Sequence, residues 1–565
     1  MTTDRLPLIP TGSRFGYRLF GDLRSGWWFG SLAVMLLVLL PVLGLLGYAS
    51  QGSGDLWSHL RTYVLPQALK DTLLLLLGVG AMVITIGTGS AWLVTAHSFP
   101  GRRFLSWALL LPLAVPTYIV AFAYLDLLHP VGPIQTWLRD ILGYTSPREF
   151  RLPDIRSMGG CILLLGLVLY PYVYLPARAL FMMQASGLLE ASRTLGASPA
   201  RTFFRIALPL ARPAIAVGAS LALMEAINDI GAAEFLGVRT LTVSIYSTWI
   251  NRGSLAGAAQ IALFMLVLVV SLIALERWAR RHQRFAASAR QTRILAPRPI
   301  QSAKGWLLVL LAWLPVLLGF VLPTSYLLVE AIKRLEFAGV EAVILRETFN
   351  TLSLAAVATL VTSFLAFVLA YSLRLAHNSR GALLMVRTAS LGYAIPGTVL
   401  AIGLLAPLGW LDTGLADLSQ QLLGASSGLL ISGTSFALIY AYCARFLAIG
   451  SGGLEAGLSK IPLSLDDAAR SLGAGANRRA GLIHLPLSRA PLAAAMLLIF
   501  VDCMKELPAT LLLRPLNFET LATHLYAEAA RGTYESGAIA ALLIVLAGLV
   551  PILLLNRYGS RQVSA

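Results

Sequence analysis

The sequence predicts an all-α, polytopic membrane protein in which about twelve transmembrane helices form two tandem repeats of six. Composition is the first observation: 57% of the 565 residues are hydrophobic, 13% are charged, and the mean hydropathy is +0.75. Near-continuous apolar runs such as 31–48, 72–94 and 539–555 are the second. Most of these runs approach the roughly 20 residues that a helix needs to cross a bilayer core. The alternating runs of an outer-membrane barrel are absent.

The basic residues give the orientation of these helices. We place the spans at about 28–49, 71–96, 104–127, 159–184, 212–236, 254–276, 305–330, 347–373, 383–410, 428–450, 490–513 and 535–556. With both termini in the cytoplasm, the inner segments hold about twice as many of the 44 Lys and Arg residues as the outer ones. This bias places most of the positive charge on the inner side and predicts a multi-pass membrane protein. We therefore expect the protein to contact membrane lipid and not nucleic acid.

An internal repeat divides the chain. Seven positions of one segment recur in another at a constant offset of 277 residues: Glu190/Asp467, Leu195/Leu472, Gly196/Gly473, Ala197/Ala474, Leu208/Leu485, Pro209/Pro486 and Leu210/Leu487. Upstream, Thr72 resembles Thr351, and Pro116 resembles Pro396. Because each half has an even number of spans, the duplication is parallel. We expect a first repeat at 1–280, a basic cytoplasmic linker at 281–304 and a second repeat at 305–565.

The repeated segments, about 187–212 and 453–490, lie on the inner side and have the pattern of a helix, a turn and a second helix. Gly196 and Gly473 are expected to end the first helix in the left-handed conformation. Ser198 is a good N-cap for the next helix in the first copy. In both copies the proline of the Leu-Pro pair is expected to break the chain before the next span.

Acidic residues occur where lipid-facing helices should have none. Glu225 and Asp229 are four residues apart and share a helix face, and Asp502 and Glu506 repeat that spacing. An ionised group at mid-membrane costs about 2.5–3.5 kcal/mol, so these groups should face a polar interior. We interpret them as a translocation path for a cation, joined by the neighbouring Asn228 and Lys505. None is a certain metal ligand, but the four carboxylates are the candidates, because hard metal ions prefer oxygen. Alternatively, these groups only pair across the halves, for example Lys505 with Glu225 or Asp229.

Several absences narrow the chemistry. The chain has no G-x-x-x-x-G-K-[S/T] phosphate loop, so ATP and Mg²⁺ should bind to a partner and not here. It has no H-E-x-x-H motif or paired histidines, which gives no reason to expect an enzyme. Cys161, Cys443 and Cys503 all lie in apolar runs without disulfide or zinc spacing, and we interpret them as small core residues.

The pattern E/D-A-A/S-x-x-x-G, followed by a Leu-Pro pair, resembles the cytoplasmic EAA loop of ABC importer permeases. In that family the loop forms a coupling helix that docks on an ATPase subunit. The resemblance implies a set of coupling residues: Glu190, Ala191, Gly196, Pro209, Asp467, Ala468, Gly473 and Pro486. Ser192 in the first copy and Asp467 in the second are mild departures from the pattern.

The whole chain resembles the ferric-iron permeases of this superfamily. The resemblance is carried by LYPYVYLPARALFM (169–182), EASRTLGASPARTFFRIALPLARPAI (190–215), MEAINDIGAAEFLGV (224–238) and GLEAGLSKIPLSLDDAARSLGA (453–474). It implies the type I ABC importer fold, a place in a bacterial inner (plasma) membrane and two copies of a cytoplasmic ABC ATPase. It also implies a periplasmic or lipid-anchored binding protein and Fe³⁺ as the transported substrate, with no cofactor bound by this chain. Residues 225–231 depart from the family's pattern, which leaves selectivity less defined than fold.

Other substrates and one other class stay open. Thiamine, polyamine, phosphonate and sulfate permeases share the coupling loop, and a proton-coupled secondary transporter can also use buried carboxylates and internal repeats. Tyrosines in the fourth span of each half could offer phenolate oxygens to iron, but we interpret them as packing residues; they are Tyr170, Tyr172, Tyr174, Tyr440 and Tyr442.

Overall fold

The computed structural model describes residues 26–183, 192, 194–280, 297–339, 341–376, 379–424 and 429–563. Over these residues the chain is almost entirely helical, with one two-residue strand pair. Nine of the described helices are long and apolar enough to cross a membrane, and the number rises to twelve when each of three bent helix pairs counts as one span. The predicted polytopic, all-α fold is therefore confirmed.

The chain forms two compact units, which interleave in sequence. One, here the second-half unit, comprises 1–45, 352–395 and 403–503, and the other, the first-half unit, comprises 46–351, 396–402 and 504–565. The division does not follow the sequence halves, since each unit takes segments from both. The repeat boundaries 1–280 and 305–565 stay a prediction about the duplication and do not describe the compact units.

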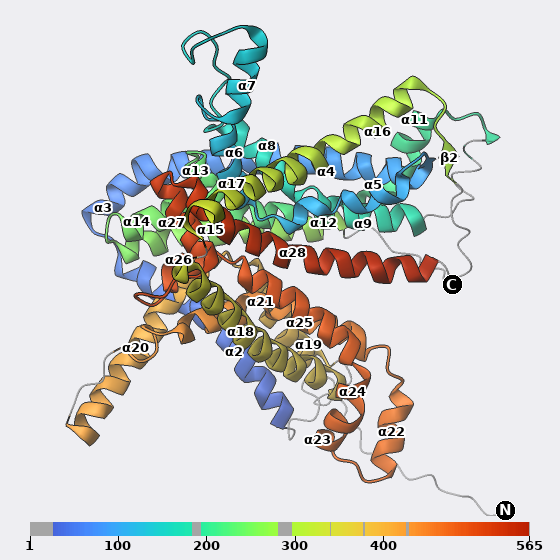
Figure 1. The fold of residues 1–565 in the computed structure, drawn as a ribbon. Helices are drawn as coiled ribbons and strands as arrows, with labels where there is room; N and C mark the ends of the chain where they lie inside the picture. The colour runs from blue at the N-terminus through green and yellow to red at the C-terminus, as the bar shows by residue number, and fades with distance from the viewer. Residues whose placement is uncertain are drawn as a thin grey trace, which may run out of the picture. The chain divides into compact units, whose positions relative to one another are not determined.

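The second-half unit is built mostly from the second repeat (Figure 1). Its elements, four of which also extend into the other unit, are α2 (Gly26–Gln51), α18 (Ala342–Leu375), α19 (Arg380–Ala389), η5 (Ser390–Ala394), α20 (Gly397–Leu423), α21 (Ser435–Leu458), α22 (Leu463–Ser471), α23 (Ala476–Arg479), η6 (Ala480–His484), α24 (Leu485–Leu487) and α25 (Arg489–Met504). The first repeat contributes α2, whose Ser31 hydroxyl donates to the carbonyl of Val368 at 3.4 Å. Tyr440 of α21 donates to the carbonyl of Leu37 at 2.6 Å.

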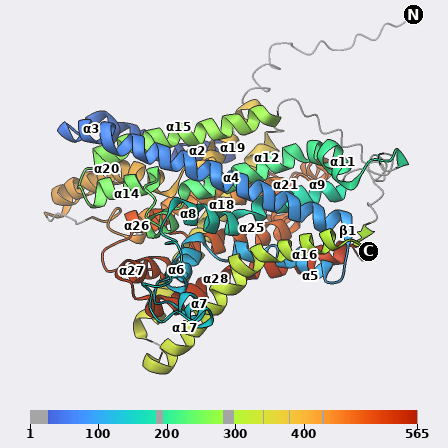
Figure 2. The same ribbon diagram turned by 90° about the horizontal axis from the view of Figure 1, so that it is seen from above.

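The first-half unit contains the remaining elements. They are α3 (Asp55–His59), η1 (Leu60–Val64), α4 (Leu65–Ala96), β1 (His97–Ser98), α5 (Arg102–Ala108), η2 (Leu111–Ala114), α6 (Thr117–Leu127), α7 (Pro133–Leu142), α8 (Met158–Leu169), α9 (Pro171–Met183), α11 (Pro199–Thr202), η3 (Phe203–Ala207), α12 (Leu208–Asn228), α13 (Gly231–Phe235), α14 (Leu241–Ile250), α15 (Leu255–Arg280), β2 (Arg298–Pro299), α16 (Ala303–Val316), η4 (Leu317–Val321), α17 (Leu322–Ala338), α26 (Pro508–Leu513), α27 (Leu521–Arg531) and α28 (Tyr534–Val563). The long helix α4 packs against α8, α9 and α12 (Figure 2).

The two repeats exchange their first helices. Helix α2 of the first repeat belongs to the second-half unit, whereas α16 and α17 of the second repeat pack against α4, α6 and α8 in the first-half unit. The Tyr124 hydroxyl of α6 donates to the carbonyl of Leu318 at 2.7 Å, which fixes this exchange with a buried polar contact. Each unit therefore includes a first helix contributed by the other repeat, a feature that the repeat pattern alone does not predict.

A one-turn π-helix precedes each of four Leu-Pro pairs. The turns η1, η3, η4 and η6 end immediately before Leu65, Leu208, Leu322 and Leu485. Proline has no N–H, and its ring clashes with the carbonyl one turn earlier, so a locally widened turn accommodates it inside a helix. The predicted break at Pro209 is therefore wrong, because the helix continues from Pro199 to Asn228. At Pro486 the chain also stays helical, and the break comes two residues later.

The end of the predicted linker is anchored. Strand β2 (Arg298–Pro299) pairs in parallel with β1 (His97–Ser98), and the Ile300 N–H donates to the carbonyl of Ser98 at 3.1 Å. Residues 281–296 lie outside the described part of the chain. This short ladder ties the start of the second repeat to the turn between α4 and α5.

Candidate coupling loops and buried carboxylates

The first coupling segment has the turn that the sequence predicts. Gly196 adopts a φ of +78°, and the Ala197 N–H donates to the carbonyl of Ser192 at 3.0 Å, as in a helix ended by a left-handed residue. Ser198 caps the next helix by accepting from the N–H of Arg201 at 3.3 Å, with Pro199 as its first residue. Glu190 and Ala191 lie outside the described residues, so their predicted roles stay predictions.

The second coupling segment repeats this turn with a weaker cap. Gly473 has a φ of +77°, and Gly475, which replaces Ser198, gives no side-chain cap. Helix α22 presents an exposed face that includes Asp467 and Ala468, and the side chain of Leu472 is 84% exposed. The equivalent Leu195 of the first copy is 87% exposed. Both copies thus have a solvent-exposed leucine beside the glycine turn.

The neighbouring Asp466 faces the opposite way, and sequence reasoning missed it. Its Oδ2 accepts from Nε and Nη2 of Arg374, at 3.0 and 2.6 Å. Arg374 also donates to the carbonyls of Leu458, at 2.5 Å, and Ile461, at 3.0 Å, where α21 ends. One guanidinium therefore joins α18, the end of α21 and the first turn of α22.

Two further side chains complete this group, the Asp466 cluster, formed by Asp466, Arg374, Arg479 and His484. Arg479 Nη1 and His484 Nε2 each lie 3.1 Å from Asp466 Oδ1. All four side chains are at most 9% exposed. Burial acts to raise the pKa of Asp466, but the hydrogen bond from Arg374 and the charge of that guanidinium outweigh it and hold that pKa below its ordinary value. The carboxylate is consequently ionised at neutral pH.

The predicted path residue Asp229 caps a short helix. It follows α12, and its Oδ1 accepts from the N–H groups of Ala232 at 2.7 Å and Ala233 at 3.4 Å, at the start of α13. Its Oδ2 accepts from the Thr117 hydroxyl of α6. The adjacent Asn228 accepts from the N–H of Gly397 at 2.8 Å. These bonds account for the burial of Asp229, which is 8% exposed.

Glu506 caps a short helix in the second repeat in the same way as Asp229 in the first. Its Oε1 accepts from the N–H of Ala509 and its Oε2 from the N–H of Thr510, both at 3.0 Å, at the start of α26. Tyr118 of α6 lies close enough to Asp229 and Glu506 for both charges to act on its hydroxyl, which donates to the carbonyl of Lys505 at 3.4 Å. The structure thus brings together two of the four predicted carboxylates around one buried tyrosine.

Glu225 of α12 and Asp502 of α25 are partly exposed and do not cap a helix. Among the residues that the structure describes, no three His, Cys, Asp or Glu side chains gather closely enough to hold a metal ion. The capping bonds give Asp229 and Glu506 a structural role at the starts of α13 and α26. A role for any of the four carboxylates in transport stays a prediction.

A matched pair of threonines supports the repeat on the outer side of the predicted topology. The Thr72 hydroxyl of α4 accepts from the N–H of Leu241, and the Thr351 hydroxyl of α18 accepts from the N–H of Leu521, both at 2.9 Å. Each hydroxyl therefore satisfies the first N–H of a following helix, α14 or α27. The predicted equivalence of Thr72 and Thr351 is confirmed.

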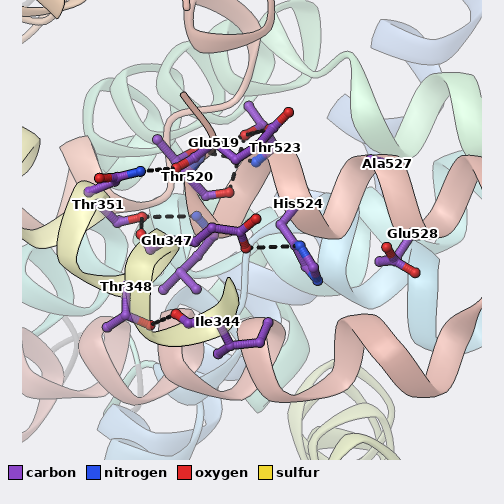
Figure 3. Close-up of polar contacts among 12 residues, drawn as sticks. Ile344, Glu347, Thr348, Thr351, Glu519, Thr520, Thr523, His524, Ala527 and Glu528 are labelled. Carbon is purple, nitrogen blue, oxygen red and sulfur yellow. Dashed lines mark hydrogen bonds and ion pairs between the residues drawn. The ribbon is translucent and has the colours of Figure 1, made fainter. Parts of the chain in front are cut away.

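The second repeat adds an ion pair beside this contact. Nδ1 of His524 lies 2.9 Å from Oε2 of Glu347, one turn before Thr351 on α18, and Glu528 follows one turn later on α27 (Figure 3). Burial lowers the pKa of His524, but Glu347 and, more weakly, Glu528 outweigh it and leave that pKa raised. The first repeat has Ala68 at the position of Glu347, so this pair is specific to the second repeat.

The tyrosines and cysteines behave as packing residues. The hydroxyls of Tyr170 and Tyr174 donate to the carbonyls of Leu109 and Ser106, each at 2.8 Å. Tyr440 does likewise with Leu37, and Tyr442 is buried. The three cysteines are buried free thiols. These contacts confirm packing for Tyr170, Tyr174 and Tyr440.

Among the described residues, nine to twelve candidate spans and two copies of an exposed glycine turn define a multi-pass helical membrane protein built by duplication. Comparison with known proteins identifies the family: its model, the binding-protein-dependent transport system inner membrane component, matches residues 83–285 and again residues 362–564. The chain belongs to this family and carries its domain twice.

Relatives with different substrates share this similarity. The Fe(3+)-transport system permease protein FbpB 2 of Haemophilus influenzae is 25% identical over 496 residues, which cover 87% of this chain and 90% of the relative. A putative 2-aminoethylphosphonate transport system permease protein, PhnU, of Salmonella typhimurium is 29% identical over 38% of this chain and 74% of its own length. The molybdenum transport system permease protein ModB of Escherichia coli is 29% identical over 36% of this chain and 87% of its own length.

Proposed function

We propose that this chain is the permease subunit of an ABC importer that moves ferric iron into the cytoplasm. An extracytoplasmic binding protein delivers the iron, and two copies of a separate ATPase subunit supply the energy. The carrying observation is the extent of similarity: the Fe(3+)-transport relative aligns across both repeats, over 87% of this chain. The 2-aminoethylphosphonate and molybdenum relatives align with 38% and 36% of it.

The exposed glycine turns support the ATPase partners. Leu195 and Leu472 are each more than 80% exposed, although a leucine is a residue that proteins usually bury. Beside Leu472, the exposed Asp467 and Ala468 complete a small docking face on α22. Two such exposed leucines beside glycine turns, one per repeat, suit two copies of one ATPase.

The acidic residues support a cationic substrate. Glu225 and Asp502 are partly exposed, unlike the capping carboxylates, so they are the better candidates for contact with a passing ion. An oxyanion such as molybdate or 2-aminoethylphosphonate is the second candidate, favoured by the higher identity of those relatives and by the cationic Lys505.

Reconstituted complexes test the proposal. The chain is purified with its ATPase and binding protein, placed in proteoliposomes, and supplied in parallel with radioactive ferric iron and with molybdate. We expect ATP-dependent uptake of iron and a several-fold loss in Glu225→Gln and Asp502→Asn complexes that still assemble. Uptake of molybdate alone would refute the iron assignment. Iron uptake that persists without ATP and stops with a protonophore would instead indicate a secondary transporter.

Cysteine labelling tests the topology. Leu195→Cys and Leu472→Cys in a background without other cysteines place a thiol on each exposed turn. Both thiols should react with a membrane-impermeant maleimide only in inside-out vesicles. Reaction in intact spheroplasts would contradict a cytoplasmic position of the coupling segments.

A further inference from the structure

The two repeats connect their coupling segment to the next span in different ways. In the first repeat, one helical path runs from Pro199 through the π turn to Asn228. In the second repeat, the path bends by 76° between Ala476–Leu487 and Arg489–Met504. A displacement of the second coupling helix therefore cannot pass along a continuous helix into its span, and another connection has to carry it.

The Asp466 cluster supplies such a connection. Asp466 lies in the first turn of α22, next to the exposed Asp467, and its carboxylate accepts from Arg374 near the inner end of α18. Its other oxygen meets Arg479 and His484 just before the bend. One buried carboxylate thus ties the coupling helix to a transmembrane helix on one side and to the segment before the bend on the other.

The first repeat has uncharged residues at the equivalent positions. Trp92, Thr95, Thr202 and Ala207 stand where the second repeat has Tyr371, Arg374, Arg479 and His484. The counterpart of Asp466 is Leu189, which lies outside the described residues. Trp92 packs against the rings of Phe181 and Phe203, with centroids 5.3 and 5.4 Å apart. The Thr95 hydroxyl bonds the carbonyl of Ala91 in its own helix.

These two kinds of contact differ mechanically. Aromatic rings keep their attraction over a range of offsets, so they can slide. A charge-assisted hydrogen bond in a buried network holds distance and direction, because any departure strands a charge away from water. The ionic connection occurs in the repeat whose helical path is bent, and the sliding contact occurs in the repeat whose path is continuous.

We propose that Asp466 is a positioning residue that locks the second coupling helix to α18, so that motion imposed on α22 by an ATPase moves α18 with it. This inference rests on the proposed function, because it needs an ATPase at the coupling face. It assigns Arg374, Arg479 and His484 to the same lock. In the first repeat the part of the coupling segment after the Gly196 turn, from Pro199 onward, runs without a bend into α12, so that part has a direct connection to its span.

Coupling stoichiometry tests the lock in the complete complex in proteoliposomes. For Asp466→Asn we expect the ATPase to co-purify in the wild-type ratio and to keep hydrolysing ATP. Substrate moved per ATP should fall about fivefold or more, the lower end of ordinary coupling between sites. Asp466→Glu, which keeps the charge, should recover part of the loss. Thr95→Val, at the first-repeat position equivalent to Arg374, should leave the ratio unchanged.

A second variant guards against simple unfolding. The quadruple change Asp466→Leu, Arg374→Thr, Arg479→Thr and His484→Ala installs the first-repeat residues and leaves no buried charge of the cluster unpaired. We expect it to fold and bind the ATPase but to transport with the same low ratio. A wild-type ratio in this variant or in folded Asp466→Asn would overturn the lock, as would loss of ATPase binding in both. If the wild-type complex itself lacks hydrolysis stimulated by the binding protein, the proposed function fails instead.

Discussion

The capping role of Asp229 predicts that two substitutions at this position differ in their effect on stability, which separates a structural role of the residue from a role in transport. Asp229→Asn keeps an oxygen for the N–H groups of Ala232 and Ala233 but removes the negative charge. Asp229→Ala removes the acceptor altogether and leaves these buried donors, and the Thr117 hydroxyl, without their partner. The two substitutions therefore differ in the cap, whereas both abolish the charge that an ion path would need.

The magnitudes follow from the bonds. A buried donor left unsatisfied costs about 1–3 kcal/mol, so Asp229→Ala should lower the free energy of unfolding by on the order of 3 kcal/mol. Asparagine is as good an N-cap as aspartate, and its neutral bonds are weaker than charged ones by about 1 kcal/mol. Asp229→Asn should therefore lose about 1 kcal/mol.

Titration with SDS in mixed micelles, followed by tryptophan fluorescence, measures these free energies. In proteoliposomes, Asp229→Asn should transport at a near wild-type rate if the residue is only a cap. Equal destabilisation by Asn and Ala would refute the capping argument. A stable Asp229→Asn protein without transport would instead favour the ion path that the sequence predicts.

Three further perturbations test other features of the fold. Thr351→Val and Thr72→Val each strand one buried N–H, so each should cost about 1–3 kcal/mol in the same titration, and equal stability to wild type would contradict the matched contacts. His524→Gln tests the pair with Glu347. Because folding raises the pKa of His524, the stability that this histidine contributes is fully present below its unfolded pKa of 6.5 and is lost as the pH rises through its folded pKa. The wild type should therefore exceed the variant in stability more at about pH 5.5 than at about pH 8.5, and a pH-independent difference would argue against the pair. Gly473→Ala forces a Cβ into a φ of +77° and should cost about 1 kcal/mol, seen as faster amide exchange in the turn, whereas unchanged exchange would show that the turn relaxes.

Local chemistry made much of this fold predictable. The two glycine turns and the Ser198 cap follow from residue types that have few alternative uses, and the structure has them where the sequence predicts them. The repeat was visible from seven residue pairs at one offset of 277, and the matched bonds of Thr72 and Thr351 support it in the structure. The error at Pro209 came from treating proline as a helix breaker, although a widened turn can accept it within an apolar span.

Long-range partners were the part that sequence could not give. Asp466 and Asp467 are adjacent and chemically identical, yet one is 4% exposed and the other has a side chain 72% exposed. Their difference depends on Arg374, which is 92 residues away from Asp466. A helical phase that groups Asp466 with the buried Ala469 was the one available signal. The capping roles of Asp229 and Glu506 could not be predicted because helices α13 and α26 are too short to show a helical periodicity in the sequence.

The exchange of first helices has a consequence for biogenesis. Helix α2 is synthesised before its hydrogen-bonding partners Val368 and Tyr440, which are 337 and 403 residues further along. While the residues between α2 and these partners are synthesised, α2 lies in the bilayer surrounded by lipid acyl chains. Its composition suits a lipid environment, since its most apolar window has a mean hydropathy of 2.6 and contains no more than two charged residues. Folding of the N-terminal helix is thus completed only after most of the polypeptide has been inserted.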